Sequence, residues 1–132
     1  FDFGNGSAND NILMGIYGSD TSKLCCEIWQ GSGIGSDVQI LGNIPYDQWK
    51  LYTWTADGAN FNFYLNDQLI TTISNVVVPN TISRTNSYIG GSNWGNDWNL
   101  KGSISTVEIY NRALSIDEIG GLFRERKGRF GL

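Results

Sequence analysis

The amino-acid sequence predicts an all-β fold built from antiparallel strands. Short stretches rich in β-branched and aromatic residues recur at intervals of about 8 to 12 residues, and Gly, Asn, Asp or Ser closes each of them. One stretch alternates between apolar and more polar side chains, and residue pairs typical of tight turns flank it. The chain has 132 residues, 40% of them hydrophobic, with 17 Gly and 2 Pro, which describes one folded domain rather than a disordered chain.

The predicted strands are stretches in which Ile, Leu, Val, Thr, Tyr, Phe and Trp dominate. In order along the chain they are residues 10–17, 24–30, 37–42, 49–56, 60–66, 69–74, 86–91 and 102–110. In 60–66, Phe61, Phe63 and Leu65 alternate with a more polar set that includes Tyr64. We therefore expect the first three side chains on a buried face and Tyr64 on the opposite, polar face.

Two turns divide residues 49–74 into a predicted three-strand antiparallel meander. Asp57-Gly58 precedes the alternating stretch and Asn66-Asp67 follows it. These residue types tolerate the positive φ angles of tight hairpin turns, so each pair is expected to reverse the chain.

One short helix is predicted near the end of the chain. Ser115 is the expected N-cap and Glu118, three residues on, completes a capping box. Gly120-Gly121 is expected to limit the helix. We therefore divide the chain into a β domain over residues 1–123 and a basic C-terminal tail over 124–132.

The composition excludes several classes of function. Residues 1–123 hold 5 basic and 12 acidic side chains, and an acidic body of this kind repels the phosphates of nucleic acids. The chain contains no His, so it has no Ser-His or Cys-His nucleophile pair and no histidine metal cage. No apolar stretch approaches the roughly 20 residues that a membrane-spanning helix needs.

The end of the chain resembles a known family. Residues 102–115 read G-S-I-S-T-V-E-I-Y-N-R-A-L-S and are followed by Asp117-Glu118-Ile119. This stretch is similar to the closing motif of laminin-G-like domains in the concanavalin A-like lectin/glucanase superfamily, which reads G-x-I-D-E-V-x-I-Y-N-R-A-L-S-x-x-E-I. Ser105 and Thr106 stand where the motif has acids. The resemblance implies a two-sheet antiparallel jelly-roll sandwich with one short C-terminal helix.

Other stretches extend the resemblance. Residues 49–70 and 88–91 are similar to the family's W…T-x-D-G…L-Y-V-N-G-x-L-V stretch and its I-G strand. Residues 1–48 fit more loosely, with Phe1-Asp2-Phe3-Gly4 similar to the strand that follows a missing opening portion of the domain. The final residues, 127–132, resemble the ends of laminin-G-like domains in phage and environmental virion proteins and in cell-surface proteins.

We expect no enzyme activity and assign no catalytic residue. Glycosidases of this superfamily need two carboxylates beside the scissile bond. The residues two positions before and after Glu27, which share its face of the strand, are Cys25 and Trp29. The strand therefore places no second acid beside Glu27. Glu108 likewise has no acid two positions away.

The candidate ligand-binding loop spans residues 92–99, between two predicted strands. Sugars present an apolar C–H face and a rim of hydroxyls, so a sugar site needs an aromatic surface with amide or carboxylate groups beside it. The loop supplies both, and its candidate residues are Asn93, Trp94, Asn96, Asp97, Trp98 and Asn99. The alternative is that Trp94 and Trp98 fold back to cover the end of the sandwich. Three other indoles are expected to pack in the core or on a face of a sheet, because they lie inside predicted strands: Trp29, Trp49 and Trp54.

Two further contacts are expected. The resemblance implies calcium as a cofactor near the rim of the sandwich, with Asp97 as its candidate ligand, because calcium prefers oxygen donors. The basic tail is a candidate contact for an acidic partner or a neighbouring subunit. Its cations are Arg124, Arg126, Lys127 and Arg129.

These observations predict a non-catalytic glycan-binding or adhesion module. We expect it on a larger extracellular, cell-surface or virion-surface assembly, with a surface carbohydrate and other protein subunits as partners, and with neither nucleic acid nor a membrane span. One alternative is a structural decoration or tail subunit of a virion that packs against its neighbours. Another is a fragment of a glycoside hydrolase whose catalytic acids lie upstream of Phe1.

Overall fold

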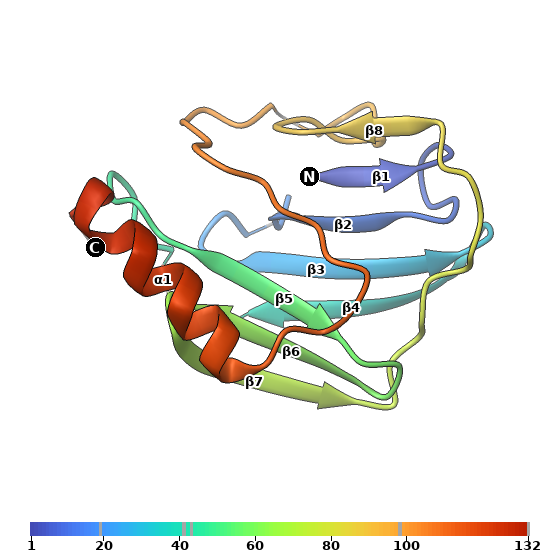
Figure 1. The fold of residues 1–132 in the computed structure, drawn as a ribbon. Helices are drawn as coiled ribbons and strands as arrows, with labels where there is room; N and C mark the ends of the chain where they lie inside the picture. The colour runs from blue at the N-terminus through green and yellow to red at the C-terminus, as the bar shows by residue number, and fades with distance from the viewer. Residues whose placement is uncertain (19, 41, 43, 98, 132) are drawn as a thin grey trace. The chain divides into compact units, whose positions relative to one another are not determined.

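The computed structural model describes residues 1–18, 20–40, 42, 44–97 and 99–131. Within these residues the chain forms two antiparallel β-sheets and one C-terminal helix, as predicted (Figure 1). The described chain divides into two compact units, each assembled from two separate stretches of sequence. The first unit contains Phe1–Ile44 and Val77–Val107, and the second contains Pro45–Val76 and Glu108–Leu132.

The first unit contains a five-stranded antiparallel sheet with the order β4-β3-β2-β1-β8. Its strands are β1 (Asp2–Gly4), β2 (Ile12–Ile16), β3 (Leu24–Gln30), β4 (Ile34–Ile40) and β8 (Asn86–Tyr88). The predicted strands at 10–17, 24–30, 37–42 and 86–91 are thereby confirmed, with shifted ends at all but 24–30. The short strand β1 confirms the strand expected at Phe1-Asp2-Phe3-Gly4.

The strand register divides the five-stranded sheet into two chemically different faces. Cys26 and Ile28 alternate along β3 with Glu27 and Trp29, and cross-strand partners share a face. Cys26 and Ile28 are buried, whereas Glu27 and Trp29 are only partly buried. Both faces therefore contain buried residues, and the face that includes Cys25, at 4% exposed, also carries a carboxylate and an indole.

The second unit contains the predicted three-strand meander. Its strands β5 (Tyr52–Ala56), β6 (Asn60–Leu65) and β7 (Gln68–Ser74) are ordered β5-β6-β7. Gly58 and Asn66 have φ angles of 87° and 58°, which are the left-handed values that tight turns require. Asp57 Oδ1 also accepts hydrogen bonds from two backbone N–H groups of its turn, those of residues 59 and 60. Local turn chemistry explains why this part of the prediction is confirmed.

The expected exposure of Tyr64 is wrong. Its side chain is only 7% exposed and forms a cluster with Leu114 and Ile119, against which Leu122 packs. The helix supplies Ile119 and Leu122, so β6 is covered on the face that its alternation pattern marked as polar. A tyrosine ring suits this position because most of its surface is apolar.

The helix α1 (Ile116–Phe130) begins as predicted and ends later than predicted. Ser115 Oγ accepts from the Glu118 N–H, and the Glu118 carboxylate accepts from the Ser115 N–H, which completes the capping box. Gly120-Gly121 does not end the helix, which continues to a left-handed C-cap at Gly131. Tertiary packing of the helix outweighs the helix-propensity cost of roughly 1 kcal/mol for each glycine.

Consequently the four cations of the predicted basic tail, Arg124, Arg126, Lys127 and Arg129, belong to the last two turns of α1. Among the described residues, no helix combines the length and the apolar character needed to cross a membrane.

The predicted strand at 102–110 is not formed. All of these residues are exposed, and the structure describes them without a strand. Side chains alternate between the two faces of a strand. In a strand over 102–110, Val107 and Ile109 would therefore share one face, and Ile104 would lie on the other. The β-branched composition predicted a strand, but strand propensity depends on packing against neighbouring strands.

Candidate functional site

The loop that follows β8 is attached to the first unit through a buried carboxylate. Asp2, at 2% exposed, accepts hydrogen bonds from Asn11 Nδ2 at 2.8 Å, from the Ser92 hydroxyl at 3.3 Å and from the Asn93 backbone N–H at 2.7 Å. Trp94 continues this turn, since its backbone N–H donates to Ser92 Oγ. The first strand of the chain therefore positions a loop some 90 residues away in sequence.

A second buried residue supports this carboxylate. Asn11 is fully buried, and its Oδ1 accepts a 2.7 Å hydrogen bond from the Asn9 N–H. Gly4 leaves room for the Asn11 side chain, because a Cβ at position 4 would lie 2.7 Å from Asn11 Cγ. The Asp2 and Asn11 side chains are thus held by both strand geometry and hydrogen bonds.

Trp94 lies against Trp29, a residue of β3. The two ring centroids are 6.1 Å apart with an interplanar angle of 55°, and both side chains are partly exposed. Trp29 Nε1 donates a 2.8 Å hydrogen bond to Glu27 Oε2. Gly35 on β4 leaves room for the indole of Trp29, because a Cβ at position 35 would lie 3.0 Å from the ring. The result is a partly exposed aromatic corner with a carboxylate at its edge.

The rest of the loop is polar and exposed. Asn96, Asp97 and Asn99 are exposed, and the Asp97 N–H donates to the Trp94 carbonyl at 3.0 Å. Asn93 Nδ2 donates to the carbonyl of Asn86 on β8, so this amide also anchors the loop. Trp98 lies outside the described residues.

The structure thus places the described members of the predicted site on one loop, with two different environments. Asn93 and Trp94 are partly buried at the base of the loop, Asn96 and Asp97 lie at its exposed tip, and the exposed Asn99 lies where the loop returns beside Gly91. Trp94 lies against Trp29 of β3, itself a partly exposed indole. The alternative, in which Trp94 and Trp98 cover the end of the sandwich, stays a prediction.

Sequence reasoning missed Asp2, Glu27 and Trp29. A signal for two of them was present, since Glu27 and Trp29 are two positions apart on a predicted strand and so share a face. No local signal connected either residue with Trp94, because that contact joins positions 65 residues apart in the chain.

Calcium has few donors at this loop. The loop contributes one carboxylate, Asp97, and the described part of the chain contains no group of three or more His, Cys, Asp or Glu side chains able to hold a metal. Calcium sites usually collect six to eight oxygen ligands, several of them carboxylates. Calcium binding at Asp97 stays a prediction of the sequence, and its donor set would depend on backbone carbonyls.

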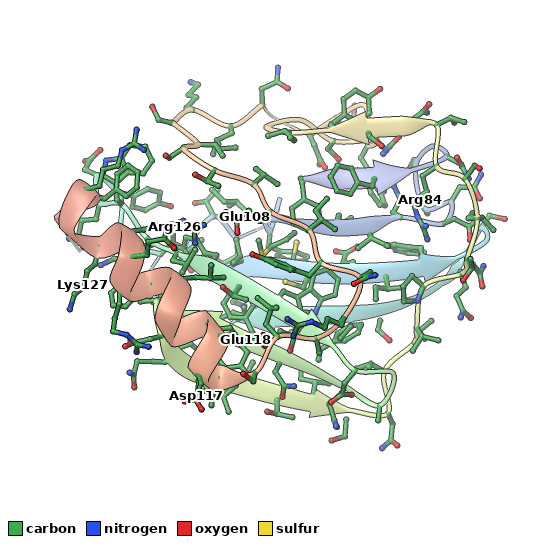
Figure 2. All side chains as sticks on the ribbon, in the orientation of Figure 1. Arg84, Glu108, Asp117, Glu118, Arg126 and Lys127 are labelled. Atoms are coloured by element: carbon green, nitrogen blue, oxygen red, sulfur yellow. The ribbon has the colours of Figure 1, made fainter. Side chains whose placement is uncertain are left out.

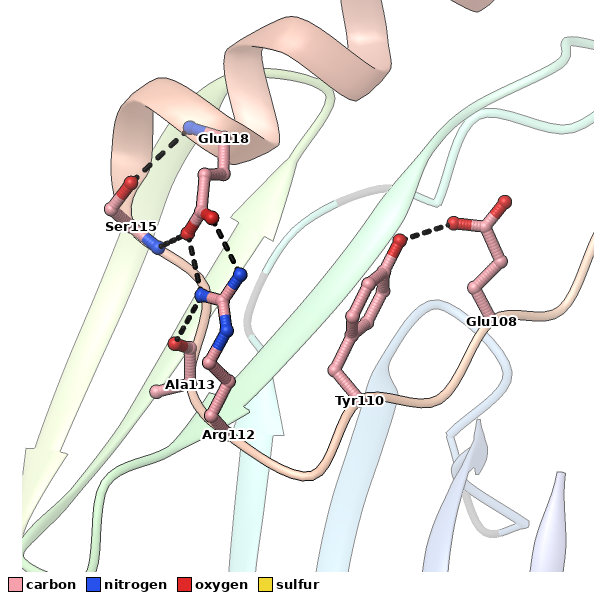
Figure 3. Close-up of polar contacts among 6 residues, drawn as sticks. All are labelled: Glu108, Tyr110, Arg112, Ala113, Ser115 and Glu118. Atoms are coloured by element: carbon pink, nitrogen blue, oxygen red, sulfur yellow. Dashed lines mark hydrogen bonds and ion pairs between the residues drawn. The ribbon is translucent and has the colours of Figure 1, made fainter.

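A second group of polar contacts surrounds the start of α1 (Figure 3). The Arg112 guanidinium makes two hydrogen bonds to the Glu118 carboxylate, at 2.6 and 2.8 Å, and a third to the carbonyl of Ala113. The hydrogen bonds from Arg112 and from the Ser115 N–H lower the pKa of Glu118 from 4.5 to about 2. These charges are satisfied within the second unit and hold the capping box in place.

Glu108 joins two other residues of the second unit. Its carboxylate accepts a hydrogen bond from the Tyr110 hydroxyl at 2.7 Å and forms an ion pair with Arg126 (Figures 2 and 3). The hydrogen bond to Glu108 raises the pKa of Tyr110. Arg126, one of the candidate partner contacts, is therefore engaged within the unit.

The four cations of α1 do not form one stripe. Successive residues of an α-helix are turned by about 100°, so these four positions are distributed around the axis. Arg124, Lys127 and Arg129 are exposed, and the Arg129 guanidinium carbon lies 5.2 Å from the centre of the Phe130 ring. Lys127 and Arg126 point to different sides of the helix in Figure 2.

A shallow depression of about 410 Å³ lies beside α1. Its lining consists of Tyr110, Arg112, Leu114, Glu118, Gly121, Leu122 and Glu125. Two of its charged groups, Arg112 and Glu118, already bind one another, so the depression offers little unengaged polar chemistry.

Comparisons with known proteins agree with the fold. Residues 1–120 match the laminin G domain family described as the "Concanavalin A-like lectin/glucanases superfamily". No curated protein sequence matches the chain. A solved structure of an S-layer domain-containing protein from Clostridium thermocellum (residues 221–444) is similar, with a TM-score of 0.56 and 25% sequence identity. That similarity covers 93% of this chain and 61% of the clostridial chain, so this chain spans less than two thirds of its length.

Proposed function

Because the chain belongs to the laminin G domain family of the concanavalin A-like lectin/glucanase superfamily, we propose that it is a non-catalytic glycan-binding module. We place its site at the corner of Trp29 and Trp94, with the exposed tip of the loop over residues 95–97 beside it. An extracellular or cell-surface location follows from this proposal, and the similarity to a clostridial S-layer domain-containing protein supports it.

The observation that carries the proposal is the partly exposed Trp29 and Trp94 pair. Indole rings bind the apolar C–H face of a sugar, and nearby amides and carboxylates bind its hydroxyls. Glu27 lies at the edge of the pair, while Asn96 and Asp97 extend from the same loop. Sites of this kind are usually preformed, and the buried Asp2 contacts provide that rigidity here.

The absence of catalysis is part of the proposal. Glycoside hydrolysis requires two carboxyl groups that flank the scissile bond. The Glu27 carboxylate accepts a hydrogen bond from the neighbouring indole, which suits a fixed binding group. Asp37 is the register partner of Glu27 on β4, so hydrolysis is the outcome to test directly. A reducing-sugar assay on every glycan that binds should detect no product.

A glycan array tests the binding site. We expect specific binding by the wild-type protein and its loss in Trp29→Ala and in Trp94→Ala. Trp49→Ala is the matched control, because Trp49 is 39% exposed and packs on Phe130 within the second unit. Equal binding by wild type and both site variants would reject the site. A parallel array with a calcium chelator tests the predicted role of Asp97, which would be supported by loss of binding.

A second candidate function is a structural subunit of a surface layer. It is favoured by the edge strand β7, which contains no charged residue and exposes Leu69 and Ile70. Uncharged edge strands with exposed apolar side chains are prone to pair with another chain. Sedimentation of wild type and Ile70→Lys distinguishes the roles, because a subunit of this kind should self-associate and the variant should not. A monomeric wild-type protein that binds glycans would favour the first function.

A further inference from the structure

The five strands of the first unit carry charge of one sign only. Within β1, β2, β3, β4 and β8 the charged residues are Asp2, Glu27 and Asp37, and these strands contain no Lys or Arg. Asp97 on the neighbouring loop adds a further exposed carboxylate. The aromatic corner formed by Trp29 and Trp94 therefore belongs to an acidic sheet and an acidic loop.

The basic side chains of the first unit belong to other segments. Lys23 forms an ion pair with Asp20 at 3.3 Å. The Arg84 side chain (Figure 2) donates to the carbonyl of Asp10 at 2.7 Å and to that of Asn80 at 3.1 Å. The last, Lys101, follows the loop and is exposed. At the corner itself the described contacts place the Glu27 carboxylate, and neither the strands nor the loop contains a Lys or Arg.

We propose that this site takes glycans bearing amines, accepts neutral glycans more weakly, and rejects glycans bearing carboxylates or sulfates. The proposal rests on the proposed glycan-binding function and adds the charge class of the ligand. The two indoles make the site, and the carboxylates decide which sugars bind there. Specificity of this kind arises as much from repulsion of the wrong ligand as from attraction of the right one.

Two interactions favour an ammonium group at the corner. A cation over the face of an indole is attracted by the ring's electron density. The Glu27 carboxylate, held 2.8 Å from Trp29 Nε1, can accept a charge-assisted hydrogen bond from the same ammonium. A uronate or sulfate group placed there would instead meet the like charge of the Glu27 carboxylate.

The test compares three oligosaccharides of matched length by calorimetric titration. These are an N-acetylated chito-oligosaccharide, the same oligomer after deacetylation, at a pH where its amines are protonated, and an oligogalacturonate. We expect the amine-bearing oligomer to bind roughly 2- to 5-fold more tightly than the neutral one. The oligogalacturonate should not bind measurably. The difference between the first two should shrink at high salt, because salt screens exposed charges.

Glu27→Gln separates the charge effect from the shape of the site. Glutamine retains an oxygen that can accept from Trp29 Nε1, so the indole should keep its position. We expect the ratio of the two affinities, for the amine-bearing over the neutral oligomer, to fall to about 1 in this variant. Glu125→Gln is the matched control, since Glu125 is an exposed carboxylate on α1 in the second unit.

Three outcomes overturn the inference. Oligogalacturonate binding equal to that of the neutral oligomer would overturn the inference and leave the glycan-binding function standing. An unchanged amine preference in Glu27→Gln would do the same. If none of the three oligosaccharides binds and the glycan array is also blank, both the function and the inference fail together.

Discussion

At the scale of single residues, Asp2 has the largest influence on the candidate site. Its two carboxylate oxygens accept from an amide, a hydroxyl and a backbone N–H, and two of these donors belong to the loop that carries Trp94. A buried carboxylate in this position is tolerated because each of its oxygens is hydrogen-bonded. The loop conformation therefore depends on one side chain at the other end of the first unit's sequence.

We predict that Asp2→Asn destabilises the fold and loosens the loop. In the variant, an NH2 donor would replace one of the acceptor oxygens and would face another donor. An unsatisfied buried polar group costs about 1–3 kcal/mol. Urea unfolding should show that loss in the free energy of unfolding, and the fluorescence of Trp94 should become more solvent-like. Asp47→Asn, at an exposed position with a φ of 60° that Asn tolerates, is the control. Equal stability of Asp2→Asn and wild type would contradict the anchoring role.

Gly4 provides a second prediction at this scale. A Cβ at position 4 would overlap the Asn11 side chain, whose position is held by Asp2 and by Asn9. We expect Gly4→Ala to destabilise the protein by about 1–3 kcal/mol, the usual cost of overpacking a core. Gly15→Ala adds a methyl group at a position with no neighbour within 4 Å, so its melting temperature should stay close to that of wild type. The prediction fails if the two variants melt together.

At the scale of elements, α1 shows how local and tertiary interactions combine. The capping box sets its first residue, because Ser115 and Glu118 satisfy each other's backbone N–H groups. Its length is set elsewhere: Ile119 and Leu122 pack with Tyr64 and Leu114, which supports the helix through two glycines. The same helix converts β6 into a strand covered on its supposedly polar face.

We predict a specific loss of stability in acid from the start of α1. The folded pKa of Glu118, about 2, lies below its ordinary value of 4.5. The carboxylate therefore contributes its full stabilisation above about pH 4.5, and the contribution is lost as the pH falls towards 2. Melting temperatures of wild type and Glu118→Gln should differ at neutral pH and converge below pH 3.

Glu125→Gln supplies the control for this pH dependence, because Glu125 lies on the same helix and is exposed. Its difference from wild type should be small at every pH. A Glu118→Gln difference that is constant from pH 7 to pH 2 would show that the Arg112 and Ser115 contacts do not hold the carboxylate.

At the scale of the whole molecule, each unit is assembled from distant parts of the chain. β1 pairs with β8 through Asp2 and Tyr88, and the cluster under α1 joins Tyr64 to Ile119. Proteins whose contacts join residues far apart in sequence fold slowly, because the chain must close long loops before these contacts form. The chain passes from the first unit to the second between Val107 and Glu108, inside the exposed segment 101–110.

We predict that limited proteolysis cuts this segment first. Residues 101–110 are exposed and lie outside the described helices and strands. Proteases cleave preferentially in exposed segments of this kind. Among the basic residues that precede α1, trypsin should cleave earliest after Lys101, and mass spectrometry should detect fragments 1–101 and 102–132. Earlier cleavage after Lys50 or Arg84 would indicate that 102–110 is protected, as the strand predicted from its sequence would be.

Elements with local causes could be predicted from the amino-acid pattern alone. Alternation and turn pairs located most strands, Gly58 and Asn66 set the turns of the meander, and Ser115 with Glu118 set the start of the helix. Family membership was also predictable, because the closing motif over 102–119 lies in one continuous stretch. These features depend on interactions among residues a few positions apart, so the pattern of neighbouring residues is enough to recover them.

Four other features depend on long-range packing and could not be predicted in this way. The tertiary structure buried Tyr64 beneath α1, carried the helix through Gly120-Gly121, left 102–110 without a strand, and brought Trp29 to Trp94. Each outcome depends on contacts between residues far apart in the chain, and periodicity records only which face a side chain occupies. What covers that face, and whether a carboxylate such as Asp2 meets its donors there, is settled by packing once distant segments meet.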